Sequence, residues 1–329
     1  MSKATTLRRW ARRSGAALAA TTLAAAGAVA LAQPAQAAEQ SVTDATLRWG
    51  LNKESGGGAF FGGCNFLSAG VAGDAGSSRL WTEADGFYKN SEGNVRIVKP
   101  TANGGEAEPT WATKCQGPDG TAVNTSVNST TGSEVVISNG TGTVDTAAGT
   151  ASITWDGDFS VVFYGGLTYS TASDPVQTVN ADRSGVLKAT GSGYGADMND
   201  TDEWAQLPAT AIDLATFKAG AFSLTATGVT AQPDYLGVEV NAAQEQVRTS
   251  ATWGAFPQSF VDFQGGTGQG PYWYSSGGGA DPKKPAIPVT FGWTLSDEGP
   301  TDPGTDPGTD PGTDPGNDPG PTAPADYDN

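Results

Sequence analysis

Residues 134–164 read EVVISNGTGTVDTAAGTASITWDGDFSVVFY, and this stretch decides the fold class. Apolar and polar side chains alternate in short runs, which is the period of a half-buried β-strand. Asn-Gly and Asp-Gly dipeptides between such runs are strong signals for tight turns, so we predict a hairpin at Asp156-Gly157. The predicted strands are Glu134–Ser138, Thr141–Asp145, Ala151–Trp155 and Phe159–Tyr164, with a further turn at Asn139-Gly140.

The same pattern continues on both sides of this stretch. A strand is predicted to begin at Asp174-Pro175 and run through Val179, and Val186–Thr190 forms the next. Helical periodicity is scarce: Asp213–Lys218 is the one short helix predicted, and Leu47–Lys53 is ambiguous. Many short strands with frequent turns predict an all-β chain, an antiparallel β-sandwich-like domain with few short helices. Four tryptophans in strand-like runs are predicted to lie in its core: Trp49, Trp155, Trp253 and Trp293.

Both ends of the chain differ in composition from its middle. Residues 1–37 join a basic stretch, an apolar run and Ala35-Gln36-Ala37, which is the pattern of a secretory signal peptide. From residue 299 onward the chain repeats Thr-Asp-Pro-Gly, a composition that cannot bury apolar surface and predicts a disordered tail over 299–329. The folded domain is therefore expected over 38–298, in a secreted or cell-surface protein.

The net charge narrows the choice of partners. The whole chain has 18 basic and 35 acidic residues. The predicted signal peptide contains five of the basic residues and no acidic one, so the mature chain would carry 13 against 35, or −22. Such a surface repels nucleic acid and anionic lipid, and we expect neither nucleic-acid binding nor membrane insertion after signal cleavage.

The chain has two cysteines, Cys64 and Cys115. An even count in an oxidising compartment predicts one disulfide between them. Residues 53–133 are rich in glycine and contain both cysteines, so we expect long loops held by that bridge.

Candidate ligand-binding residues are aromatic. Tyr88 sits in a glycine-flanked turn, where its phenol could face solvent and coordinate iron, although a packing role is the alternative. Tyr272, Trp273 and Tyr274 are predicted to form an exposed patch for stacking on a sugar ring or a porphyrin, or else a cover over one end of the domain.

Other chemistries find less support in the sequence. The chain has no histidine, which excludes Ser-His-Asp and Cys-His catalysis, and we expect no enzyme; a glycosidase with two distant carboxylates is left open. One acidic run has oxygen ligands for a divalent cation, but solvation is the simpler interpretation: Asp197, Asp200, Asp202 and Glu203.

Several motifs in fixed order resemble the HtaA domain family, which occurs in surface and secreted proteins of actinobacteria. The motifs span about residues 45–296: Leu47–Leu51, Ile153–Gly166, Ser173–Val179, Gly185–Gly195, Trp253–Phe263 and Tyr272–Gly278. The resemblance implies a haem-binding β-sandwich module that captures haem and passes it to other proteins of an iron-acquisition system. It also implies that a tyrosine soon after the opening Trp-Gly strand is the axial ligand, assisted by a histidine.

This sequence departs from that pattern at the ligand positions. Residues 58–64 read GAFFGGC, with Phe60 and Phe61 in the region of the expected tyrosine, and no histidine is present. Two functions follow as hypotheses. The first is haem capture or assistance in it, with haem as cofactor and Tyr88, Tyr272, Trp273 and Tyr274 as the binding residues. The alternative is a non-enzymatic adhesion module, or a glycan- or protein-binding module, that has lost haem ligation, with cell-wall glycan as a partner.

Overall fold

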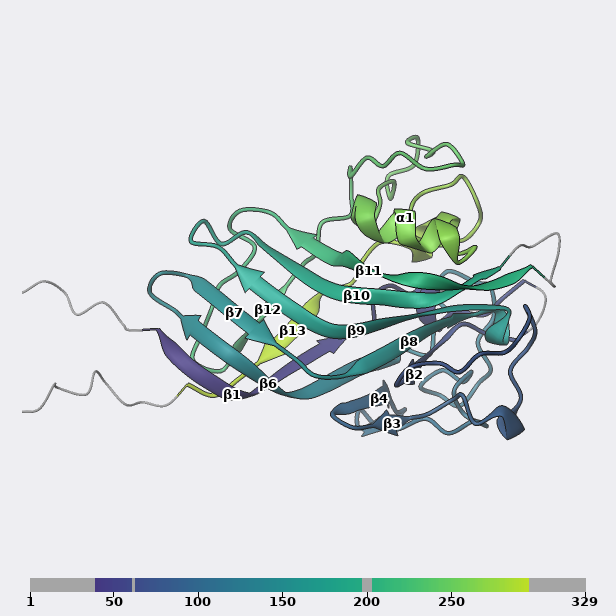
Figure 1. Cartoon of the computed structure of the whole chain (residues 1–329), viewed down its shortest axis with the longest axis horizontal. Coiled ribbons are helices and arrows are strands. Elements are labelled where there is room, and N and C mark those ends of the chain that lie inside the picture. Colours follow the sequence, from purple (N-terminus) through teal and green to yellow (C-terminus); the bar gives the residue numbers. More distant parts are fainter. Residues whose placement is uncertain (1–38, 61–62, 197–202, 296–329) are drawn as a thin grey trace, which may run out of the picture. The chain divides into compact units, whose positions relative to one another are not determined.

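The computed structural model describes residues 39–60, 63–196 and 203–295, and within them the regular structure is mostly antiparallel β-sheet (Figure 1), which confirms the predicted class. The predicted signal peptide (1–37) and tail (299–329) lie outside the described residues. The strands are β1 (Gln40–Trp49), β2 (Phe66–Ala69), β3 (Ser91–Glu92), β4 (Val95–Pro100), β5 (Glu106–Ala107), β6 (Glu134–Asp145), β7 (Thr150–Thr154), β8 (Asp158–Phe163), β9 (Thr168–Val179), β10 (Gly185–Ala196), β11 (Trp204–Phe217), β12 (Gly228–Ala231) and β13 (Val289–Gly292). The helical elements are α1 (Gln258–Gly266) and five short 3-10 helices, η1 (Glu54–Gly56), η2 (Glu83–Asp85), η3 (Tyr164–Gly166), η4 (Gly270–Tyr272) and η5 (Asp281–Lys283).

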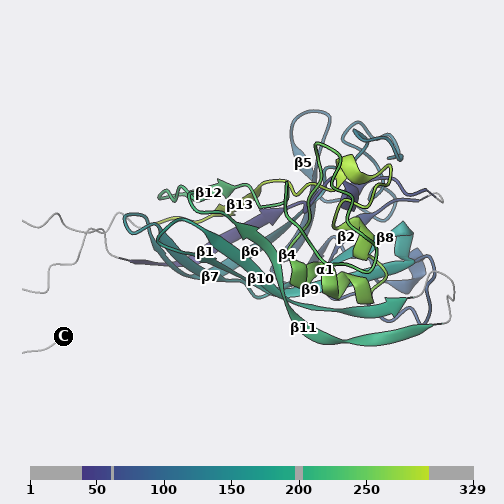
Figure 2. The same ribbon diagram turned by 90° about the horizontal axis from the view of Figure 1, so that it is seen from above.

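The strands form one continuous sheet in the order β11-β10-β9-β7-β6-β1-β13-β12. Two branches leave this path: β8 and then β2 extend from β9, and β4 extends from β6 with β3 and β5 beside it. Strand β1 therefore pairs with β6 on one side and with β13, the last strand, on the other. Helix α1 covers β10 and β11 (Figure 2), and its Phe260, Val261 and Phe263 enter the core.

Strands β7 and β8 do not form the hairpin predicted at Asp156-Gly157. Both pair with β9, one after the other along its length, so the dipeptide is a break in a nearly continuous strand. The break lies opposite Asp174-Pro175, which is inside β9 and does not begin it. Asp174 has a positive φ of 51°, and Pro175 has no N–H to donate, so β9 bulges at this point. The hairpin turn lies instead at η3, between β8 and β9.

The predicted turn at Asn139-Gly140 is likewise inside a strand. Strand β6 runs through it and exchanges its neighbour there, from β4 to β7. Asn139 adopts the left-handed conformation at φ 59°, which asparagine tolerates better than most residues. A side chain at Gly140 would lie 2.3 Å from Nε1 of Trp155, so the bulge also makes room for that indole.

One further element differs from the prediction. Asp213–Lys218 does not form a helix: residues through Phe217 belong to β11, where Ile212, Leu214 and Phe217 are buried. The pairing of β11 with β10 overrides a weak local helical pattern.

The main core lies between the strands and under α1. Trp49, Trp155 and Trp293 are buried in it as predicted, at 5% exposure or less. Trp253 is half-exposed and is not among the buried core residues, which corrects the prediction for that residue.

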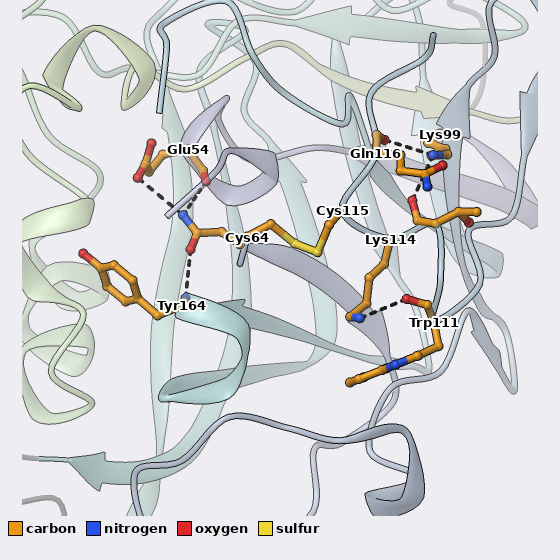
Figure 3. Close-up of a disulfide and its surroundings, with 10 residues drawn as sticks. Glu54, Cys64, Lys99, Trp111, Lys114, Cys115, Gln116 and Tyr164 are labelled. Atoms are coloured by element: carbon orange, nitrogen blue, oxygen red, sulfur yellow. Dashed lines mark hydrogen bonds between the residues drawn. A yellow bond between two sulfur atoms is a disulfide. The ribbon is translucent and has the colours of Figure 1, made fainter. Parts of the chain in front are cut away.

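The segment 53–133 is loop-rich, with only short strands and 3-10 helices, as predicted. The disulfide between Cys64 and Cys115 is present (Figure 3), with Cα atoms 5.7 Å apart and the cysteines separated by 51 positions in the sequence. It fixes a loop of the second half of this segment to the residues that lead into β2. No helix in the described part of the chain has the length and apolar character needed to cross a membrane.

Candidate functional site

A second apolar cluster lies on the opposite face of β2, β8 and β9 from the main core. Its buried members include Phe66, Trp81, Val162 and Tyr169, while their neighbours in sequence Leu67, Val161 and Phe163 belong to the core. We call it the outer aromatic cluster, because half-buried rings surround the buried ones: Phe87, Tyr88, Trp111, Tyr194 and Trp204.

Tyr88 belongs to this cluster. Its ring packs edge-on against Phe66 and Trp111, with centroids 5.7 and 6.0 Å away. Its hydroxyl donates a hydrogen bond to the carbonyl of Pro109 at 2.9 Å, and burial raises the pKa of Tyr88 above its ordinary value. A phenol must lose its proton to coordinate ferric iron as phenolate. Both observations therefore oppose coordination by Tyr88 in this conformation.

Tyr272, Trp273 and Tyr274 do not form the predicted exposed patch. Trp273 and Tyr274 are fully buried in the main core, and the Tyr274 hydroxyl donates to the carbonyl of Gln244 at 3.0 Å. Tyr272 is half-buried and stacks on Phe163 at 4.7 Å. The segment packs inward because β8 and α1 offer it aromatic partners.

The Tyr272 hydroxyl is also engaged, since it donates to the hydroxyl of Tyr164 in the η3 turn. Burial is the first cause that raises the pKa of Tyr272, and the hydrogen bond to Tyr164 adds to it. Tyr88 and Tyr272–Tyr274 belong to different clusters, so the structure does not bring the predicted residues into one site.

A different aromatic pair is arranged for stacking. Tyr194 near the end of β10 and Trp204 at the start of β11 are diagonal neighbours, because Tyr194 pairs with Gln206 and Trp204 with Ala196. Their rings are 5.0 Å apart and inclined by only 10°, and both side chains are half-exposed. We call this pair the Tyr194–Trp204 platform.

The platform is held in place by Tyr169 and by the loop that follows β2. Tyr169 is buried under the platform, with its ring 5.8 Å from Tyr194 and 5.5 Å from Trp204. Its hydroxyl donates to the carbonyl of Gly73 at 2.6 Å and accepts from the amide of Ala75 at 3.0 Å. These bonds place the loop against the rings before any ligand arrives.

Asp74 in this loop gives the platform an acidic edge. Its Oδ1 accepts hydrogen bonds from Trp204 Nε1 at 2.7 Å and from the amide of Gly76 at 2.8 Å. The Asp74 side chain is exposed, so a ligand on the platform would meet a carboxylate beside two aromatic faces. Such a surface suits a ligand with a flat apolar face and hydroxyl groups at its edge.

Sequence reasoning did not identify this pair. Tyr194 was noticed only as part of a motif, and Trp204 was not considered. A signal existed: both rings flank the acidic run at 197–203, and two alternating segments around a short polar run predict a hairpin. Of that run, only Glu203 lies within the described residues. In the described ranges, no group of three or more His, Cys, Asp or Glu side chains could hold a metal ion.

Two surface hollows lie elsewhere. One of about 570 Å³ is lined by residues that include Lys218, Tyr235 and Leu236, and one of about 530 Å³ lies within the loop 117–130. Neither contains a predicted site residue or the platform.

Comparison with known proteins gives a distant structural likeness. No family model matches the chain, and no curated protein matches it. The crystal structure of the C-terminal domain of HtaA from Corynebacterium glutamicum is similar to this chain at 13% sequence identity and a TM-score of 0.38, and the match covers 78% of this chain and 99% of that one.

Proposed function

We propose that this chain is an exported, non-enzymatic binding module that holds a glycan on the Tyr194–Trp204 platform. The observation that carries the proposal is the nearly parallel, half-exposed ring stack with the Asp74 carboxylate beside it. The flat face of a pyranose ring presents C–H groups that pack on aromatic faces, and its hydroxyls can donate to a carboxylate. The platform therefore matches both the apolar face of a sugar ring and its hydroxyl groups.

The charge of the site favours a neutral ligand. Haem carries two propionates, which the Asp74 carboxylate and an expected mature charge near −22 would repel. A neutral oligosaccharide has no such penalty. Export supports cell-wall glycan as the source, because that is the glycan an exported and wall-associated protein meets first.

Haem capture is the second candidate. It is favoured by the HtaA-like motifs and by Tyr194, a half-exposed phenol that stacks on Trp204. The predicted ligands Tyr88 and Tyr272 would first have to give up their hydrogen bonds to Pro109 and Tyr164.

The test uses the secreted chain and three proteins: wild type, Trp204→Ala and Trp253→Ala. Trp253 is the matched control, because it is also half-exposed but lies beside Arg248 and outside the platform. Each protein is mixed with insoluble peptidoglycan and titrated with soluble N-acetylglucosamine oligomers, while intrinsic fluorescence is recorded. We expect wild type and Trp253→Ala to bind, and Trp204→Ala to bind about 5- to 150-fold more weakly, from the loss of about 1–3 kcal/mol of stacking.

Hemin titration of the same proteins separates the two candidates. A saturable shift of the Soret band at one equivalent, together with no retention on peptidoglycan, would replace the glycan proposal with haem capture. Equal glycan binding by all three proteins would refute the platform as the site.

A further inference from the structure

A buried group of three reactive side chains lies beneath the glycine-rich loop 56–58. Glu54 comes from η1, Asn65 precedes β2, and Lys283 ends η5, so the group joins the two ends of the described chain. Their exposures are 5%, 1% and 1%. An ammonium group buried this deeply is uncommon, and its partners decide what chemistry it can take part in.

The Glu54 carboxylate lies between the amine and the carboxamide. Lys283 Nζ is 3.0 Å from Glu54 Oε2, and Asn65 Nδ2 is 3.4 Å from Oε1 and 2.9 Å from the Glu54 carbonyl. The lysine contact is an ion contact without hydrogen-bond geometry, since Oε2 has no correctly angled donor among the described residues. The ammonium is therefore close to the carboxylate and incompletely satisfied by it.

The neighbouring Lys284 shows what a satisfied buried lysine looks like here. Its Nζ donates to the Tyr274 carbonyl at 3.0 Å, Ser276 Oγ at 2.9 Å and Asp281 Oδ1 at 2.6 Å, which uses all three protons. Lys283 has instead one ion contact, to Glu54, in the part of the chain that the structure describes. The two adjacent lysines thus have different roles.

The loop backbone lets the Lys283 amine approach Gly57 closely. A Cβ at Gly57 would lie 2.1 Å from Lys283 Nζ, so only glycine permits this position. The carbonyl of the same Gly57 accepts a hydrogen bond from the Asn65 amide at 2.8 Å. The amine therefore lies beside Gly57, whose carbonyl accepts the hydrogen bond from the Asn65 amide.

Burial also favours the neutral form of the carboxyl group. It raises the pKa of Glu54, although Lys283 opposes this effect. A proton shared from Lys283 to Glu54 leaves a neutral amine, which is a nucleophile, and a carboxylic acid, which is a proton donor. On the other side, Asn65 Oδ1 accepts the Tyr164 amide proton at 2.9 Å (Figure 3), so a donor is already aimed at the oxygen that would become negative on attack.

We propose that Lys283 and Asn65 form an intramolecular amide bond, with Glu54 as the proton carrier. Lys283 passes a proton to Glu54, and its nitrogen lone pair attacks Cγ of Asn65. The charge that forms on Oδ1 is held by the Tyr164 amide. Glu54 then delivers this proton to Nδ2, the Cγ–Nδ2 bond breaks, and ammonia leaves. The Nζ–Cγ bond replaces it without any oxidant or external reagent. The second proton, which Nζ loses on becoming an amide nitrogen, passes to the Glu54 carboxylate and then departs with the ammonia as ammonium.

This bond would close a covalent ring from the start of β2 to the end of η5. It is independent of the glycan proposal, because it uses none of the platform residues. It would leave the folded chain unable to unfold fully even after the disulfide is reduced.

The test is mass spectrometry of the secreted chain. We expect the intact protein to be lighter by one ammonia than its sequence and disulfide require, and a protease digest to contain one branched peptide joining residues 65 and 283. Trypsin would then fail to cleave between Lys283 and Lys284. The branched peptide separates this linkage from ring closure at Asn-Gly sites, which also releases ammonia.

Three variants complete the experiment. Lys283→Arg keeps the charge but cannot form the bond, and Glu54→Gln lacks the proton carrier. Both variants should therefore have the full mass that their sequence and disulfide require, with no loss of ammonia. Lys284→Arg is the matched control and should keep the branched peptide. An unmodified Lys283 in wild-type protein overturns the proposal whether or not the variants fold. A branch from Lys283 to residue 54 would also overturn it, because the acyl group would then come from Glu54 and not from Asn65.

Discussion

The main core and the outer aromatic cluster use the same residue types in different ways. In the core, Trp49 and Trp155 are sealed between strands and beneath α1. In the outer cluster, the cover consists of loops held by one disulfide, and several rings stay half-exposed. The densest aromatic run of the sequence, Tyr272–Tyr274, packs inward, while the exposed platform is assembled from two separate strands. Whether an aromatic ring is buried or available to a ligand depends on the element that covers it. It does not depend on how many aromatic residues lie beside it in the sequence.

The largest expected difference is in stability. Trp155→Ala should lower the free energy of unfolding by about 3–5 kcal/mol, because it opens a cavity in the sealed core. It also removes the hydrogen bond from Nε1 to the carbonyl of Ala45. Trp204→Ala should lower it by only about 1 kcal/mol, since a half-exposed ring loses little burial and one hydrogen bond. Denaturant titration of both variants measures this contrast, and equal losses would show that the two clusters do not differ in this respect.

A smaller effect should follow from opening the disulfide. We expect the double variant Cys64→Ala, Cys115→Ala to lose about 2–4 kcal/mol if the bond acts through loop closure. Native-state hydrogen exchange should then accelerate mainly in 53–133, where loops form the cover, and should change little in β6 and β9. Uniform acceleration along the chain would mean that the outer cluster does not open separately from the core.

The smallest effect is a dependence on pH in the outer cluster. Lys114 lies 3.3 Å from the centroid of the Trp111 ring, and burial lowers the pKa of Lys114 to about 8. Between that value and the ordinary lysine pKa of about 10.4, the unfolded chain binds more protons than the folded one, so stability should rise with pH across this window. The ring favours the charged amine and limits the rise. Thermal melts of wild type and Lys114→Met from pH 7 to 11 measure it as the difference between the two curves, because the buried tyrosines affect both proteins alike. A difference that does not shift in favour of wild type over this window would contradict the assignment.

The fold class and the disulfide could be predicted from the sequence because each depends on a simple pattern. Alternation identified β6 to β10 in outline, and two cysteines leave only one possible intrachain pairing. The dipeptides Asn139-Gly140, Asp156-Gly157 and Asp174-Pro175 were correctly recognised as places where the backbone bends. Whether each dipeptide forms a turn or a bulge could not be predicted. A residue with positive φ, or one without an N–H, can lie in a bulge inside a long strand as well as in a turn between two short strands.

The candidate site could not be predicted to the same extent. Tyr88 and Tyr272 were selected because they are tyrosines near glycines, but local composition does not show which hydroxyls find a carbonyl or a second phenol. The Tyr194–Trp204 platform requires the β10–β11 register, and a shift of one residue would separate the two rings. Haem coordination by the predicted tyrosines stays a prediction that the hemin titration can decide.

The pairing of β1 with β13 also constrains when this protein can fold. Nε1 of Trp49 donates to the carbonyl of Ile287 at 2.9 Å, across 238 positions. Strand β1 thus has one empty side until nearly the whole domain has been synthesised. Such long-range closure makes folding slow and leaves an unpaired edge open to aggregation in the meantime.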